Sequence, residues 1–203
     1  MMKLAKLCTR HNWARRHNTP SALPQFYLFS DTERLPDPGP LLSRLPKGAC
    51  VVLRQTDRQS LINLARLIVP QARKLGLKVI IAGDIRLALQ TGADGVHLSE
   101  HLTRRGRPRL KSKKSGFFVT SAAHGRLALW RAQHAGADLI FLSPVFATKS
   151  HPKAHGLGVL RFAVLARSCP IPVIALGGIT PINATRLALG PAHGFAAIGA
   201  WSN

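Results

Sequence analysis

Short runs of β-branched and aromatic residues alternate with longer amphipathic segments from Pro24 onward. The runs predicted as strands are Phe26–Ser30, Cys50–Arg54, Lys78–Ala82, Gly95–Ser99, Phe117–Ala122, Leu139–Val145, Pro172–Gly177 and Gly194–Ala200. The segments with helical periodicity between them are Leu61–Leu75, Arg86–Gly92, Gly125–Gly136, Gly158–Ser168 and Pro181–Leu189. Strands and helices that alternate at this spacing form parallel sheets with right-handed crossovers. Eight such strands predict a (β/α)8 TIM barrel, because closure removes the exposed edges of the sheet.

An open, doubly wound sheet is the alternative architecture. No Gly-x-Gly-x-x-Gly motif follows the first strand, which weakens its dinucleotide-binding version. Helix one has little room, because Pro36, Pro38, Pro40 and Pro46 crowd the segment between strands one and two. The sequence also stops soon after strand eight. We therefore expect helices one and eight to be short or missing, and the N-terminal segment or a second subunit to cover the exposed flank.

Basic residues dominate the charge of the chain. There are 29 Lys and Arg residues against 8 Asp and Glu, which gives a net charge of +21, and the excess gathers in residues 1–16 and 104–114. Such clusters attract nucleic acids, anionic lipids and phosphates without sequence specificity. A solvated loop with a loose tail is the alternative interpretation. Nucleic-acid binding predicts an affinity that falls steeply with salt concentration.

We expect two regions, a basic flexible extension over residues 1–23 and a barrel over residues 24–203. The extension lacks the apolar core of a secretory signal, and it is as compatible with an organellar transit peptide as with a bacterial extension. No apolar run reaches the roughly 18 residues that a membrane span needs. Cys8, Cys50 and Cys169 are sparse and widely spaced, which favours a reducing, cytoplasmic environment, with Cys50 and Cys169 as core thiols.

Two glycine-bearing turns are the clearest candidate site. One turn follows strand seven as Ala175-Leu-Gly-Gly-Ile-Thr180, and the other follows strand eight as Ala197-Ile-Gly-Ala200. Glycine lets backbone N–H groups approach an anion, and loops seven and eight are the usual phosphate cradle of a barrel. Tight turns without a ligand would also contain glycine. The residues that we predict to bind phosphate here are Gly177, Gly178, Ile198 and Gly199.

The loop after strand six, Ser143-Pro-Val-Phe-Ala-Thr-Lys-Ser-His151, carries hydroxyl and amino groups. Such a loop can order over a bound anion. We predict that Thr148, Lys149 and Ser150 contribute to phosphate binding.

Three motifs now point to a family. Gly92-Ala-Asp-Gly-Val-His-Leu98, Gly136-Ala-Asp138 followed by the strand-six loop, and Ile174-Ala-Leu-Gly-Gly-Ile179 occur in an order and spacing that resembles the thiamin-phosphate synthase and TenI (thiazole tautomerase) family. The resemblance runs from about Phe26 to the C-terminus. It implies a barrel that binds small phosphorylated pyrimidine and thiazole substrates. In the synthases, an aminopyrimidine diphosphate loses pyrophosphate with the help of Mg2+, and the thiazole nitrogen attacks the pyrimidine methylene.

The resemblance also implies individual roles for three residues. Arg54 is what remains of the family's Gln-x-Arg-Glu-Lys segment, and it is the expected diphosphate contact. His124 matches the proton-transfer histidine of TenI proteins, although Ala122 replaces the serine of the Ser-x-His motif. His151 stands where the family has the lysine that closes the strand-six loop. His97, within strand four, is expected to be structural.

The Mg2+ ligands of the family are missing at the matching positions. The Asn-Asp pair after strand three aligns with Ala82-Gly83, and the second aspartate aligns with Leu102. Asp84 and Glu100 lie one or two residues away, and a Mg2+ ion prefers carboxylate ligands, so these two are weak candidates for a shifted site. The alternative is that Asp84 caps the following helix.

Three functions remain open. The first is thiamin-phosphate synthesis by an enzyme with a degenerate Mg2+ site. The second is a TenI-like tautomerase, or a non-catalytic thiazole-phosphate binder, which needs no Mg2+ and depends on His124. The third is a basic barrel that binds nucleic acid. A homo-oligomer is compatible with all three.

Overall fold

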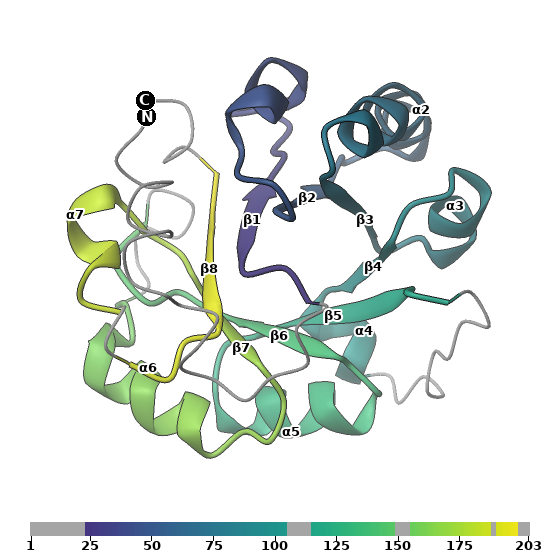
Figure 1. Cartoon of the computed structure of the whole chain (residues 1–203). Coiled ribbons are helices and arrows are strands. Elements are labelled where there is room, and N and C mark those ends of the chain that lie inside the picture. The colour runs from purple at the N-terminus through teal and green to yellow at the C-terminus, as the bar shows by residue number, and fades with distance from the viewer. Residues whose placement is uncertain (1–22, 105–114, 149–154, 188–189, 199–203) are drawn as a thin grey trace.

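Eight parallel strands close into a barrel with the helices on its outside (Figure 1). The computed structural model describes residues 23–104, 115–148, 155–187 and 190–198. The strands are β1 (Phe26–Phe29), β2 (Cys50–Leu53), β3 (Lys78–Ala82), β4 (Gly95–Leu98), β5 (Phe118–Ala123), β6 (Leu139–Leu142), β7 (Val173–Leu176) and β8 (Gly194–Ala197). The helices are η2 (Gly39–Arg44), α2 (Arg58–Lys74), α3 (Ile85–Gln90), α4 (Glu100–Arg104), α5 (Arg126–His134), α6 (Gly158–Arg167) and α7 (Pro181–Ala184). Because β1 pairs with both β2 and β8, the predicted (β/α)8 barrel is confirmed.

Several element boundaries differ from the predictions. β6 ends at Leu142 rather than at Val145, because Pro144 has no N–H to donate to a ladder. α7 covers Pro181–Ala184 rather than Pro181–Leu189, and the chain continues as a turn through Leu187. The short helix α4 was not predicted at all. Within the described residues, no helix is both long and apolar enough to cross a membrane.

The prediction of a reduced helix one is confirmed. The 3-10 helix η2 stands in its place, with Pro40 in its first turn and Leu41 and Leu42 buried against the barrel. Helix eight and the extension over residues 1–22 fall outside the described residues, so those predictions, including cover of the bare flank, stay predictions.

Two of the cysteines lie where the sequence predicted. Cys50 is buried inside the barrel, and burial raises the pKa of its thiol well above the ordinary value. Cys169 is half-buried and packs against the outer core, between the strands and the helices. Both are free thiols, and Cys8 lies outside the described residues.

Aromatic side chains fill the interior of the barrel below the C-terminal ends of its strands. Phe141 makes edge-to-face contacts with Tyr27, Phe29 and His97, with ring centroids 4.8, 5.0 and 5.2 Å apart. His97 is buried, and its Nδ1 lies 3.0 Å from the hydroxyl of Thr120. The expectation that His97 is structural fits this packing. The interior is therefore a solid core rather than a channel.

Burial lowers the pKa of His97 from 6.5 to about 3, with a smaller effect from the nearby charge of Arg54. Between these two pH values the unfolded chain binds a proton at this position and the folded chain does not. Stability therefore falls as the pH drops below 6.5, by about 1.4 kcal/mol per pH unit from this residue.

We predict that His97→Phe removes part of this acid sensitivity while keeping the aromatic packing. Between pH 6.5 and 4.5 the free energy of unfolding should fall by roughly 2–3 kcal/mol less in the variant than in the parent. Urea unfolding at several pH values measures the difference. His134→Phe, at an exposed histidine of α5, is the control and should follow the parent. Parallel pH curves for His97→Phe and the parent would contradict the prediction.

Candidate functional site at the mouth of the barrel

The predicted site residues within the described chain gather at one end of the barrel, which we call the mouth. Because all strands are parallel, the residues that follow them lie at the same end (Figure 1). The residues concerned are Arg54 after β2, Asp84 after β3, Glu100 after β4, His124 after β5, Thr148 after β6, Gly177 and Gly178 after β7, and Ile198 after β8. Lys149, Ser150, His151 and Gly199 lie outside the described residues.

The turn that follows β7, which we call the β7 turn (Gly177–Ile179), is fixed through its carbonyl groups. Val145 N donates to Leu176 O at 2.9 Å, and Phe146 N donates to Gly177 O at 3.0 Å. The segment after β6 thus holds two successive peptide units of β7 and its turn. A planar trans peptide directs its N–H away from its carbonyl. The N–H groups of Gly177 and Gly178 therefore face away from the β6 segment.

The third peptide unit of the turn is held from the other side. The side-chain amide of Asn183 donates to Gly178 O at 2.8 Å. Among the described residues, the N–H groups of Gly177, Gly178 and Ile179 donate to no acceptor. Three consecutive amides with fixed carbonyls are donors for an anion.

Backbone conformation and close packing explain why residues 177 and 178 of the turn are glycine. Their φ angles are +93° for Gly177 and +66° for Gly178. A Cβ at Gly177 would lie 2.8 Å from Pro144 Cα, and one at Gly178 would overlap Ala147 O. Packing alone thus accounts for the residue type. The anion-binding prediction depends on the free amides of the turn and not on the glycines as such.

Ile198 continues this edge of the mouth beyond β8. Its side chain is half-buried against the interior cluster, and its N–H donates to no acceptor within the described part of the chain. The structure describes the second glycine-bearing turn only as far as Ile198, because Gly199 lies outside the described residues.

Arg54 is held by an aspartate that the sequence analysis did not assign. Arg54 Nη2 lies 2.6 Å from Asp31 Oδ2, and the side chain of Arg54 is 51% exposed. Arg34 also binds Asp31, through Nε at 3.1 Å and Nη2 at 2.8 Å. The hydrogen bond from Arg34 is the main reason that the pKa of Asp31 lies well below its usual range. A diphosphate at Arg54 would have to compete with this carboxylate.

The hydroxyl of Ser30 fixes the backbone at Arg54. It accepts a hydrogen bond from Arg54 N at 2.8 Å and donates one to Arg54 O at 3.1 Å. The ends of β1 and β2 are therefore tied together, which sets the direction from which Arg54 enters the mouth.

The two candidate Mg2+ ligands are engaged elsewhere. Asp84 caps α3 by accepting from Leu87 N at 2.9 Å, and its other oxygen pairs with Arg58 Nε at 3.0 Å. Glu100 Oε1 accepts from Arg104 at 2.5 and 3.1 Å. Within the described residues, no three His, Cys, Asp or Glu side chains are grouped to hold a metal ion. The residues present do not fit a Mg2+ site, and the helix-cap alternative matches the contacts of Asp84.

His124 sits between β5, the end of β6 and α4. Its Nδ1 lies 2.8 Å from the carbonyl oxygen of Ser143 and 3.2 Å from the hydroxyl oxygen of the same residue. The carbonyl can only accept, so this contact favours the tautomer with the proton on Nδ1. In that tautomer Nε2 is the acceptor nitrogen, and it lies 3.9 Å from Oε2 of Glu100, whose side chain is only 13% exposed.

Asp31, Ser143 and Asn183 are the contacts that sequence reasoning missed. Asn183 stands three residues after Thr180, the spacing of a capping box, and this signal was available in the sequence. Asp31 lies two residues after the end of β1, which marks it as a mouth residue. Neither signal identifies the residue that Asn183 or Asp31 contacts, because each contact depends on how distant loops meet.

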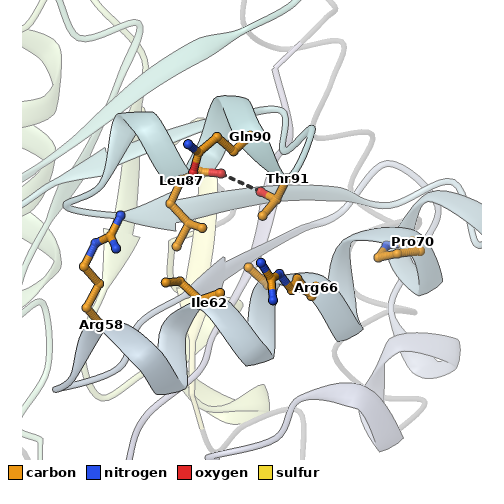
Figure 2. Close-up of a pocket in the computed structure, with 8 residues that line it drawn as sticks. Arg58, Ile62, Arg66, Pro70, Leu87, Gln90 and Thr91 are labelled. Atoms are coloured by element: carbon orange, nitrogen blue, oxygen red, sulfur yellow. Dashed lines mark hydrogen bonds between the residues drawn. The ribbon is translucent and has the colours of Figure 1, made fainter.

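A hollow of about 440 Å³ lies outside the barrel between α2 and α3 (Figure 2). It is lined by Arg58, Ile62, Ala65, Arg66 and Pro70 of α2 and by Leu87, Gln90 and Thr91 on the α3 side. Arg58 is already paired with Asp84. None of the predicted site residues lines this hollow, so it is separate from the mouth.

Eight parallel strands that close with the helices outside define the class of (β/α)8 TIM barrels. The chain belongs to the thiamine monophosphate synthase family, whose sequence model matches residues 40–201. The family resemblance seen in the sequence is thereby confirmed.

Similar proteins agree with this assignment. A candidate thiamine-phosphate synthase of Geobacter sulfurreducens is 34% identical over 188 residues, which cover 86% of each chain. The thiamine-phosphate synthase of Methanocella arvoryzae is 33% identical over 172 residues, or 79% of this chain and 77% of that one. A thiamine phosphate pyrophosphorylase from Pyrococcus furiosus has a similar structure, with a TM-score of 0.67 and 19% identity over 86% of this chain and 85% of its own. At that identity the last likeness supports the fold alone.

We predict that Asp31→Asn strengthens binding of inorganic pyrophosphate, because it removes the carboxylate that competes for Arg54. The expected gain is roughly three- to tenfold, equivalent to about 1 kcal/mol for a partly exposed pair. Isothermal titration calorimetry at low salt measures it. Asp94→Asn, which breaks the pair with Lys78 at the start of β3, is the control. An unchanged Kd in Asp31→Asn would show that Arg54 does not meet the anion.

Proposed function

We propose that this chain is a thiamin-phosphate synthase that couples an aminopyrimidine diphosphate to a thiazole phosphate and releases pyrophosphate. Family membership over residues 40–201 supports the reaction class. The observation that carries the proposal for this chain is the set of free, fixed amides in the β7 turn. These suit the phosphate of the thiazole substrate, which accepts several hydrogen bonds at once.

The reaction breaks the bond between the pyrimidine methylene carbon and the diphosphate oxygen. It forms a bond from the thiazole nitrogen to that carbon, and pyrophosphate departs with the electron pair. Negative charge therefore grows on the leaving group, and cations that face it lower the barrier. Arg54 is the described residue that meets this requirement best, because half of its side chain is open at the mouth. Lys149 lies in the strand-six loop and is assigned to the same task on sequence grounds.

The described carboxylates offer no Mg2+ site, so no step is assigned to a protein-bound metal. Without such a site, the leaving group depends on basic side chains. We expect a slow reaction for this reason, since metal ions stabilise developing phosphate charge more effectively than exposed guanidinium groups do.

Incubation of the protein with both substrates, with and without Mg2+, tests the coupling activity. We expect thiamin phosphate and pyrophosphate to appear in equal amounts, detected by chromatography. Absence of product above background at high protein concentration would refute the synthase proposal. If the same preparation still bound thiazole phosphate, the result would favour a non-catalytic thiazole-phosphate-binding protein.

We predict that Gly178→Ala weakens thiazole-phosphate binding at least about tenfold, the loss of roughly one amide hydrogen bond to a charged group. The added methyl overlaps Ala147 O, so the β7 turn must shift. Gly76→Ala is the matched control, because Gly76 has φ +68°, close to the +66° of Gly178, and open space around it. Calorimetric affinities that fall equally in both variants would count against a phosphate site at the β7 turn.

His124 supports a second candidate function, a TenI-like thiazole tautomerase. The proton on Nδ1 is fixed by Ser143, and Nε2 faces Glu100, so Nε2 can exchange a proton with a substrate ring. This chemistry needs no metal. It shares the phosphate site with the coupling reaction.

We predict that His124→Gln lowers tautomerase activity about a hundredfold or more, the usual contribution of a general acid or base. Glutamine keeps a donor for Ser143 O but cannot shuttle a proton. Proton exchange at the thiazole ring, followed by NMR in D2O, is the measurement. His134→Gln on α5 serves as the control, and thiazole-phosphate affinity should stay unchanged in both variants. Equal exchange rates in all three proteins would exclude His124 as the proton carrier.

A further inference from the structure

We infer that Asn183 is a positioning residue that turns the Ile179 N–H toward the phosphate of a bound thiazole phosphate. The inference rests on the proposed function of the β7 turn and adds a residue to it. Asn183 lies on α7, the helix that follows the turn, and its side-chain amide donates to Gly178 O.

Both ends of the Asn183 side chain are used. Its Oδ1 accepts from Thr180 N at 2.8 Å, and its Nδ2 donates to Gly178 O at 2.8 Å. The first bond, together with the bond from Asn183 N to Thr180 Oγ1 at 3.2 Å, forms a capping box at the start of α7. Capping needs only an acceptor at this position. The Nδ2 bond to Gly178 O is an additional contact that the cap does not require.

This additional bond decides the orientation of one peptide unit. Gly178 O and Ile179 N–H belong to the same planar peptide and point in opposite directions. By drawing Gly178 O toward α7, Asn183 directs the Ile179 N–H away from α7. A carbonyl that accepts a hydrogen bond also polarises its peptide, which makes the N–H a better donor.

The constraint matters because this peptide is joined to a glycine. Gly178 has no side chain to restrict its ψ angle, so the peptide between Gly178 and Ile179 can tilt more than one between two larger residues. The preceding two carbonyls are held by Val145 N and Phe146 N, but Gly178 O has no other described partner. Asn183 is therefore the described contact that holds this peptide in its orientation.

The closing experiment compares Asn183→Ala with Thr180→Ala. Both substitutions damage the cap of α7, but only the first releases Gly178 O. Calorimetry measures the Kd of each variant for thiazole phosphate and for the corresponding thiazole alcohol, which lacks the phosphate. We expect Asn183→Ala to bind thiazole phosphate about tenfold more weakly with little change for the alcohol, as for one lost charge-assisted hydrogen bond. Thr180→Ala should keep the parent's preference for the phosphate.

Asn183→Asp covers the case in which the alanine variant does not fold. Aspartate keeps the acceptor for Thr180 N and hence the cap, but it has no donor for Gly178 O. We expect the same selective loss of phosphate affinity, enlarged by charge repulsion. An unchanged preference for the phosphate in the Asn183 variants, or an equal loss in Thr180→Ala, would overturn the inference. If the parent protein itself fails to bind thiazole phosphate, the proposed function fails instead.

Discussion

Closure of the barrel is the constraint on which the mouth depends. The pairing of β1 with β8, with Tyr27 beside Ala196, brings the two ends of the sheet together. The parallel direction of all eight strands then gathers their C-terminal ends around one opening. Below this opening the aromatic rings around Phe141 fill the interior. Within the described residues, the barrel is therefore closed below the mouth by packed rings, among them that of the polar residue His97.

Most of the acidic residues of this chain are engaged in contacts that support the fold. Of the 8 acidic residues, Asp94 and Asp138 accept the N–H groups of Val79 and Val119 on neighbouring strands. Asp84 caps a helix, and Asp31 holds two arginines. Among 29 basic residues, every such pairing also relieves repulsion between cations. The two acidic residues that the sequence offers as weak Mg2+ candidates, Asp84 and Glu100, are likewise engaged in a helix cap and in ion pairs with Arg58 and Arg104.

The alternation of short hydrophobic runs with amphipathic helical segments was sufficient to predict the barrel. Each strand buries one face inside the barrel and the other under the helices, so the strands stand out as hydrophobic runs. The prolines between Pro36 and Pro46 also identified the weak first helix, which η2 confirms. Contacts between distant loops were not predictable. The pair of Arg54 with Asp31 joins residues 23 positions apart, and it depends on the geometry of two strand ends. The early end of α7 was not predictable either, because the helical periodicity of the sequence continues beyond Ala184.

The groups at the mouth are preorganised to different degrees for the two proposed substrates. In the proposed complex the phosphate monoester would meet three amides whose carbonyls are already fixed by Val145, Phe146 and Asn183, so little ordering would be needed on binding. The diphosphate would meet Arg54, whose guanidinium would first have to leave Asp31 or share it. Preorganised donors stabilise charge more than groups that reorganise during the reaction. Under the proposed function, the mouth is therefore better preorganised for the thiazole phosphate than for the pyrophosphate leaving group, and it is the departure of pyrophosphate that requires the basic side chains of the loops.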